Sequence, residues 1–239
     1  MFPPSIPDTE QRRRFALVRE ALRPAVTDAT IALVQNHSAL TSEESKVSAR
    51  AALEAYAAAA ALMPYKPFLE AAERWRYDLD ALCRRFGVSY EQAAHRLATL
   101  RRPGAAGVRF AFMRSDASGY VTKRLSLPRL PLPRYGNACP LWVINSAFQT
   151  PGLTARSFGE LPSGDQFLFF ARAIEKHPPT AALPRHLLSV MLACSAAEAD
   201  RVCYADGIDR TVAMAPVGTI CRLCPRVACA HRQEAPLIV

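Results

Sequence analysis

The feature that most limits the possible folds is a change of pattern at Pro103-Gly104. Before it, apolar residues recur every three or four positions, as at Val18 and Leu22, which is the spacing of a helix with one buried face. After it, apolar and polar residues alternate in GVRFAFMRSD, which is the period of a half-exposed strand. We therefore predict an α+β fold in which a helical N-terminal half, residues 1–103, packs on an antiparallel or mixed sheet formed by residues 104–239.

Several helix ends are marked by local signals. Ser42 precedes two glutamates and an alanine-rich run, which predicts a helix from Ser42 to Leu62. Gly87 predicts the C-terminus of a later helix, and Ser89 with Gln92 has the spacing of a capping box at the start of the next one. Pro24 is predicted to break the first helix, because proline lacks the amide donor and clashes with the preceding turn.

The second half reads mainly as strands. The turn SDASG between GVRFAFMR and YVTKRLSL predicts a β-hairpin. LWVINSAF and DQFLFFARAIE predict further strands, whereas RHLLSVMLAC fits either a strand or a buried helix. LPRLPLPRYGNACP is too rich in proline for a central strand and is predicted to be a connection. Ser195 with Glu198 predicts a short helix.

The segment CRLCPRVACAHR, residues 221–232, holds three of the seven cysteines of the chain. Its C-x2-C-x4-C spacing suits zinc or an iron–sulfur cluster, although the second ligand pair usual in a structural zinc site is missing. An odd number of cysteines argues against a disulfide framework. We favour a cluster that takes a fourth thiolate from Cys139, Cys194 or Cys203, with His231 as a weaker candidate; ordinary reduced thiols are the alternative.

The formal net charge of +9 indicates an anionic partner without identifying it, because arginine forks suit carboxylates and phosphates of many kinds. Around GNACPLWVINSAF, basic side chains adjoin aromatic ones. An aromatic pocket with a basic mouth suits an acyl chain joined to a phosphorylated carrier. The candidate ligand-binding residues are Lys123, Arg124, Arg134, Trp142 and Phe148. The alternative is that Trp142 and Phe148 belong to the core of a strand.

Other classes of protein lack support in the sequence. There is no H-E-x-x-H, G-x-S-x-G, P-loop or G-x-G-x-x-G motif, so we predict no catalytic residue. No apolar run reaches eighteen residues, and the N-terminus lacks a basic segment followed by an apolar one. We therefore expect no membrane span, no secretory signal and a cytoplasmic protein.

Four stretches resemble one family of bacterial transcription factors. LMPYKPFLEAAERWRYDLDALCRRFGVSYEQAAHRL resembles part of a domain related to ImmA/IrrE metallopeptidases. YGNACPLW, CYADGID and PVGTICRLCPRVACAHRQEAP resemble the C-terminal module of the short-chain fatty-acid regulators, which control acyl-CoA metabolism. The resemblance covers roughly residues 51–236, and the ordered series of motifs is more specific than any one of them.

The resemblance implies a sensor module that binds a coenzyme A thioester and forms a homodimer. It also implies a 4Fe–4S cluster, with Cys194, Cys221, Cys224 and Cys229 as the matching ligands. The chain departs from the family in two respects. It lacks a segment long enough for the usual N-terminal helix-turn-helix, and it lacks the zinc-binding H-E-x-x-H motif. His37 and Glu54 resemble the surroundings of that motif.

These departures argue against direct DNA binding and proteolysis, and they favour a chain that acts without its own DNA reader or passes its signal to a protein partner. We thus expect an iron–sulfur regulatory sensor of a short-chain acyl-CoA. The alternatives are an iron–sulfur enzyme acting on an acyl-CoA or another small anion, and nucleic-acid binding by the arginine-rich helices.

Overall fold

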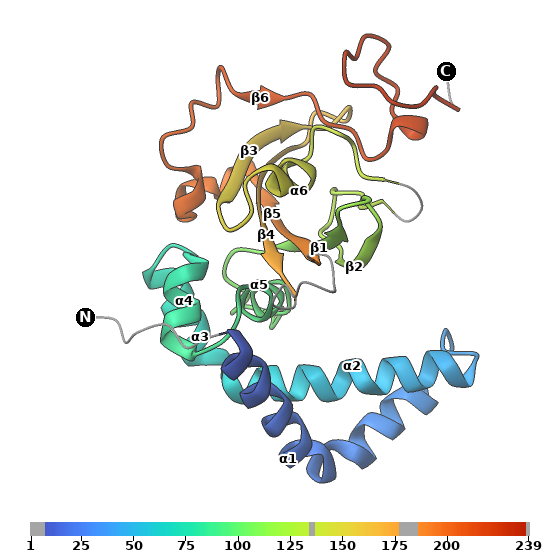
Figure 1. Ribbon diagram of the computed structural model, residues 1–239, viewed down its shortest axis with the longest axis vertical. Helices are drawn as coiled ribbons and strands as arrows, with labels where there is room; N and C mark the ends of the chain where they lie inside the picture. The colour runs from blue at the N-terminus through green and yellow to red at the C-terminus, as the bar shows by residue number, and fades with distance from the viewer. Residues whose placement is uncertain (1–7, 134–136, 177–185, 238–239) are drawn as a thin grey trace, which may run out of the picture. The chain divides into compact units, whose positions relative to one another are not determined.

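The computed structural model describes residues 8–133, 137–176 and 186–237 (Figure 1). The chain forms two compact units, Met1–Arg96 and Leu97–Val239. The boundary expected from the sequence pattern is residue 103. Each unit is described by itself below.

The N-terminal unit is helical. Its elements are α1 (Asp8–Gln35), α2 (Glu43–Leu62), α3 (Tyr65–Arg74), α4 (Leu79–Phe86) and α5 (Tyr90–Ala98), the last of which runs into the second unit. None of the helices in the described ranges combines the length and the apolar composition that a membrane crossing requires.

The predicted helix ends are confirmed. The Ser42 hydroxyl accepts a hydrogen bond of 3.1 Å from the Ser45 amide at the start of α2. Gly87 ends α4 with a positive φ of 62°, which glycine adopts without steric cost. At α5, the Ser89 amide donates to Gln92 Oε1 at 2.9 Å and the Gln92 amide donates to Ser89 Oγ at 3.3 Å, which is the reciprocal pattern of a capping box.

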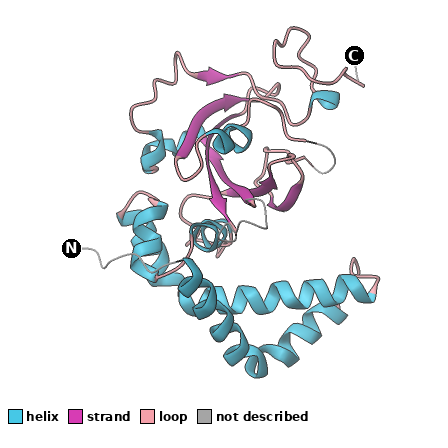
Figure 2. Cartoon of the chain, in the orientation of Figure 1, coloured by secondary structure: helices cyan, strands magenta, loops and turns pink. Residues whose placement is uncertain are grey.

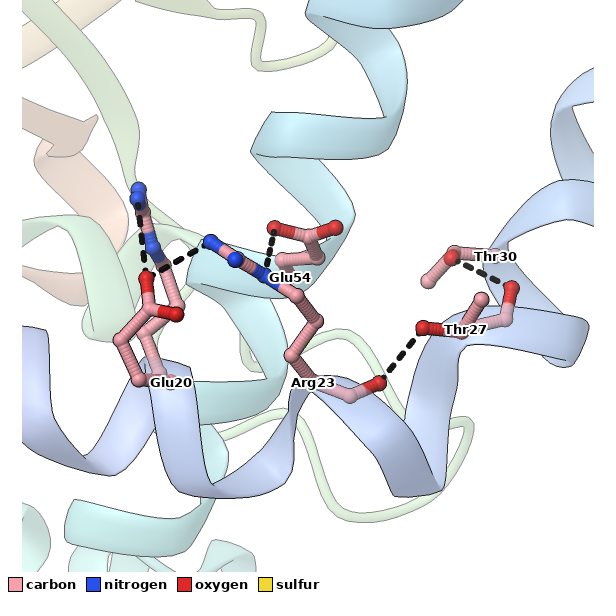
Figure 3. A network of polar contacts seen from close by, with 6 residues as sticks. Glu20, Arg23, Thr27, Thr30 and Glu54 are labelled. Carbon is pink, nitrogen blue, oxygen red and sulfur yellow. Dashed lines mark hydrogen bonds and ion pairs between the residues drawn. The ribbon is translucent and has the colours of Figure 1, made fainter.

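The predicted break at Pro24 is wrong, because α1 continues through this residue. The helix instead bends along its length (Figure 1), as is usual where a proline deprives the carbonyl four residues earlier of its donor. Figure 3 shows the contacts on either side, in which Arg23 reaches Glu20 at 2.6 Å and Glu54 of α2 at 3.7 Å. The Thr27 hydroxyl also donates to the Arg23 carbonyl at 2.7 Å. Contacts within α1 and with α2 therefore hold a helix that proline alone would weaken.

The C-terminal unit contains one six-stranded sheet in the order β2-β1-β5-β4-β3-β6 (Figure 2). The strands are β1 (Ala111–Asp116), β2 (Val121–Leu125), β3 (Thr154–Glu160), β4 (Gln166–Glu175), β5 (Leu187–Ser195) and β6 (Met214–Ala215). All neighbours are antiparallel except β3 and β6, which are parallel. A helical unit and a mixed sheet in one chain confirm the predicted α+β class, and the predicted hairpin is β1–β2.

The expected strand at LWVINSAF is wrong. The segment forms α6 (Val143–Ser146) and the 3₁₀ helix η1 (Ala147–Gln149). A turn precedes it, in which the Trp142 amide donates to the Cys139 carbonyl at 2.9 Å and Asn145 Nδ2 donates to the same oxygen at 3.0 Å. This turn starts a helix whose buried side chains, Val143, Ile144 and Ala147, pack on the sheet.

Three further 3₁₀ helices follow the strands. Ser195 caps η2 (Ala196–Arg201), where the short helix was expected, and η3 (Cys203–Ala205) and η4 (Cys221–Leu223) come later. Beyond β6, the described chain consists of loops and η4 (Figure 2). The cysteine-rich segment thus has only the short η4 as a regular element, and hydrogen bonds join it to Glu160 of β3 and, through Gly218 and Thr219, to the turn before α6.

The two faces of the sheet carry different residues, because successive side chains of a strand point to opposite sides. One face presents Met113, Phe169 and Ala193 to the core that contains α6, Trp142 and Val217. The other face presents Leu168 and Cys194, which lie opposite each other on β4 and β5. This alternation decides which cysteines can meet.

Candidate functional site

Four cysteine side chains line one narrow cavity at the end of the C-terminal unit. Cys139 comes from the turn before α6, Cys221 opens η4, and Cys224 and Cys229 lie in the loop that follows. The other residues that line the cavity are Pro140, Pro216, Gly218, Ile220, Arg226, His231 and Arg232. The structure thus adds one thiol, from a segment about eighty residues earlier in the chain, to the three that share the C-x2-C-x4-C motif.

Two hydrogen bonds hold the Cys139 turn against the cysteine-rich segment. The Cys139 amide donates to the Thr219 carbonyl at 2.9 Å, and Trp142 Nε1–H donates to the Gly218 carbonyl at 2.7 Å. The Trp142 ring packs against Phe169 of β4 with their centroids 5.3 Å apart. The cavity is therefore joined directly to the core of the sheet.

Gly218 is required by the close approach of a thiol. A Cβ atom at this position would lie 2.8 Å from Cys224 Sγ and 3.2 Å from Cys224 Cβ, and both distances are shorter than ordinary van der Waals contact. Glycine thus lets the chain pass directly beside Cys224 while its carbonyl remains bonded to Trp142.

The pKa of the Cys139 thiol reflects its burial and the thiols near it. Burial raises the pKa of the Cys139 thiol, and the neighbouring Cys221 and Cys224 contribute in the same direction. In the part of the chain that the structure describes, no three His, Cys, Asp or Glu side chains are arranged to hold a metal ion. The thiols share a cavity without adopting a coordination geometry, yet their donor set of four sulfurs is the one that zinc and iron–sulfur clusters take.

Cys194 lies apart from these four cysteines. It is fully buried on β5, opposite Leu168, on the face of the sheet away from Trp142 and Val217. Of the ligands implied by the family resemblance, the structure brings together Cys221, Cys224 and Cys229, whereas Cys194 is absent from the cavity lining. Cys139 was named from the sequence, with Cys194 and Cys203, as a possible fourth ligand, and no pattern in the sequence distinguished it from the other two.

The burial of Cys194 predicts an effect of alkaline pH on stability. Burial, with a smaller contribution from Glu198, raises the pKa of this thiol from 9.0 to about 12. Its contribution to stability is therefore fully present below pH 9 and is lost as the pH rises toward 12, because only the unfolded thiol ionises in this range. A shift of this size corresponds to about 4 kcal/mol. Denaturant unfolding between pH 8 and 11 should show a steeper loss for the native chain than for Cys194→Ala, and parallel curves would contradict the prediction.

Of the five residues expected to bind a ligand, the four that the structure describes lie in two places, the core around α6 and the strand β2. Trp142 is fully buried and belongs to the core, and Phe148 packs against that core while half-buried. Arg124 on β2 donates to the Pro133 carbonyl at 2.9 Å, and Lys123 beside it is exposed. Arg134 lies outside the described residues. The cysteine-lined cavity contains none of the described four.

The two residues that resemble the surroundings of a peptidase zinc site have other contacts. Glu54 forms an ion pair with Arg23 of α1 (Figure 3). His37 Nδ1 accepts a hydrogen bond of 3.3 Å from the Ala39 amide in the loop before α2. These contacts account for both side chains as structural features of the helical unit.

The fold and the cavity define a class of α+β protein in which a C-terminal cysteine loop is joined to the core of a mixed sheet. Two family models match the chain, namely the C-terminal domain of the short-chain fatty acyl coenzyme A regulators over residues 99–238 and the IrrE N-terminal-like domain over residues 7–98. The chain belongs to the short-chain fatty acyl coenzyme A regulator family.

Individual relatives agree with this assignment. The "Propionyl-CoA carboxylase regulator" of Cereibacter sphaeroides is 41% identical over 94% of this chain and 49% of the relative. "HTH-type transcriptional regulator PrpR" of Mycobacterium tuberculosis is 35% identical over 92% of this chain and 46% of the relative. A solved "Mycobacterium tuberculosis transcriptional regulator" superposes with a TM-score of 0.89 at 34% identity, over 95% of this chain and 69% of that one. The chain spans about half the length of these curated relatives.

Proposed function

We propose that this chain is a regulatory sensor which binds a short-chain acyl-CoA and holds a 4Fe–4S cluster on Cys139, Cys221, Cys224 and Cys229. The observation that carries the proposal is the meeting of these four thiols in one cavity of a chain from the acyl coenzyme A regulator family. The names of two relatives, a propionyl-CoA carboxylase regulator and a transcriptional regulator, support an acyl-CoA-related role in transcription.

The thiols connect two parts of the C-terminal unit. A bound cluster supplies a redox-active centre whose assembly contributes to folding free energy. Cys139 belongs to the turn that starts α6, while the other three thiols belong to the terminal loop. Ligation by all four would therefore add a covalent link between the loop and the turn before α6, and loss of the cluster would remove that link.

The number of thiols favours a sensor over an enzyme. An iron–sulfur enzyme that acts on a small substrate needs an iron with an open position, as three thiolates would leave. Four cysteines line the cavity here, so each iron of a cubane has a protein ligand available. A cluster closed in this way holds structure or responds to oxidation, and offers no position to a substrate.

Calorimetric titration of anaerobically purified protein with propionyl-CoA, acetyl-CoA and free coenzyme A tests ligand binding. We expect the acyl thioesters to bind more tightly than free coenzyme A. Lys123→Ala should weaken binding about ten-fold, because it removes one charge-assisted contact to a phosphate. Lys66→Ala, which removes an exposed lysine of the other unit, should leave the affinity unchanged. Absence of binding by all three compounds would refute the acyl-CoA proposal.

The way in which the signal leaves the chain is part of the same proposal. We propose a homodimer that passes its state to a DNA-reading segment or to a protein partner. Light scattering coupled to size exclusion tests the dimer, since a monomer at every concentration would contradict it. DNA binding by the chain at low salt would show instead that it contacts nucleic acid directly.

A further inference from the structure

We propose that Arg232 is the positioning residue of the cysteine site, which fixes the loop backbone so that Cys221, Cys224 and Cys229 line the same cavity as Cys139. The hydrogen bonds of Arg232 support its role in ordering the loop. The inference that this order serves metal binding rests on the proposed function. Neither the cysteine spacing nor the net charge of the segment singles out this arginine among its neighbours.

The guanidinium of Arg232 donates to three carbonyl groups within residues 221–232 and to a fourth, that of Glu234, at 3.3 Å. Nη1 donates to the Cys221 carbonyl at 2.9 Å, Nη2 donates to the Cys224 carbonyl at 3.1 Å, and Nη2 also donates to the Arg226 carbonyl. Two of these carbonyls belong to cysteines of the site. This loop contains no strand or α-helix whose backbone bonds would fix its carbonyl groups. The planar guanidinium of Arg232 fixes several of them at once.

The same loop is tied to the rest of the unit at other points. Arg226 Nη2 donates to the Glu160 carbonyl of β3 at 2.8 Å, and Gly218 lies against the Cys224 sulfur. Arg232 thus bonds to the carbonyl of a residue whose side chain is anchored on the sheet. Its three bonds within residues 221–232 complete a chain of contacts from β3 through the loop to the thiols.

Arg232 also brings a positive charge beside the four sulfurs, since it lines their cavity. Thiolates are the form of cysteine that binds metals, and a set of four carries excess negative charge. Groups that orient metal ligands from outside the coordination sphere typically change metal affinity by about 10–100-fold when replaced. The hydrogen bonds of the guanidinium and its positive charge should both increase metal affinity. A lysine at this position would keep only the charge.

Arg222 offers a matched control in the same loop. Its side chain is more than half exposed and pairs with Glu234 at 3.1 Å. The Cys221 and Cys224 carbonyls accept from Arg232, whereas the side chain of Arg222 pairs with that carboxylate. Arg222→Lys therefore makes the same chemical change as Arg232→Lys at a similar place in the sequence, without removing the contacts that the proposal invokes.

The test has two measurements on the full chain. In the first, metal retained by the native protein, Arg232→Lys and Arg222→Lys is titrated against a chelator under anaerobic conditions, with zinc as the probe metal. In the second, hydrogen exchange is followed on the metal-free proteins in peptides covering residues 218–232 and in peptides from β4 and β5. We expect Arg232→Lys to bind zinc at least ten-fold more weakly and to exchange faster only in the loop, while Arg222→Lys matches the native protein.

Three outcomes would overturn the proposal about Arg232, and a fourth would overturn the metal site alone. Native affinity and native exchange in Arg232→Lys would show that the fork positions nothing. Equal losses in both variants would show a general effect of side-chain change in the loop. Faster exchange in β4 and β5 as well would show that Arg232 supports the whole unit. If the native chain binds no metal, the proposed metal site fails, and the exchange of the metal-free proteins still decides whether Arg232 orders the loop.

Discussion

Replacing Trp142 with alanine is expected to lower the free energy of unfolding of the C-terminal unit by about 3–5 kcal/mol, the usual cost of removing a large buried aromatic side chain. Trp142 is 1% exposed, packs on Phe169 and donates to the Gly218 carbonyl. The substitution leaves a cavity beneath α6 and also frees the segment that leads to Cys221. Denaturant unfolding followed by circular dichroism measures the loss.

Trp142→Phe is the control for this substitution. It keeps an aromatic ring against Phe169 and removes the indole N–H, so we expect a smaller loss of about 1–2 kcal/mol from the unpaired Gly218 carbonyl. If Trp142→Ala unfolds like the native chain but loses acyl-CoA binding, Trp142 lines a ligand pocket and is not a core residue. That result would restore the role suggested by its position in the sequence.

Replacing Arg96 with alanine is expected to destabilise the N-terminal unit by about 3 kcal/mol. Arg96 is 2% exposed, and its Nε–H donates to the Met63 carbonyl at 3.0 Å. Its guanidinium lies over the rings of Tyr56 and Tyr65, with distances of 5.5 and 5.8 Å to their centroids. The estimate combines a hydrogen bond from a charged donor with cation–π contacts of a buried guanidinium to two partly exposed rings.

Arg96→Met tests whether the charge or the volume matters. Methionine fills most of the space without the hydrogen bond, so we expect a loss smaller than that of alanine. The readout is thermal unfolding followed by the fluorescence of Trp75, which lies in the same unit. Equal melting temperatures for the native chain and both variants would show that the buried guanidinium contributes nothing net to stability.

The parts of the fold that sequence reasoning recovered depend on neighbours along the chain. Ser42, Gly87 and the Ser89–Gln92 pair act within one helical turn, so their chemistry is readable locally. The β-hairpin likewise depends on a turn between two alternating segments. In each case the interaction that fixes the structure joins residues no more than a few positions apart.

The parts that sequence reasoning missed depend on distant contacts. The LWVINSAF segment has the composition of a strand, but its helical form buries Val143, Ile144 and Ala147 on a sheet whose central strands, β4 and β5, come later in the chain. Pro24 remains inside α1, where Arg23 beside it contacts a glutamate of α2. In both segments, contacts with residues distant in the sequence therefore outweigh the local conformational preference.

The cysteine site shows the same division. The three thiols of the C-terminal motif were recognisable from their spacing, whereas the cavity takes its fourth cysteine from the turn before α6. That turn meets the loop through the Cys139–Thr219 and Trp142–Gly218 hydrogen bonds, which spacing does not encode. The register of β5 determines the face of the sheet on which Cys194 lies. That register is set by the pairing of β5 with β1 and β4, which are distant in the sequence.

Iron and acid-labile sulfide in the anaerobically purified chain test the central claim most directly, with Cys139→Ala and Cys194→Ala compared in parallel. Cys139 lines the cavity, and Cys194 lies on the opposite face of the sheet. The account predicts about four iron and four sulfide ions per native chain, their loss in Cys139→Ala, and native content in Cys194→Ala. Retention of the cluster by Cys139→Ala together with its loss from Cys194→Ala would contradict the account.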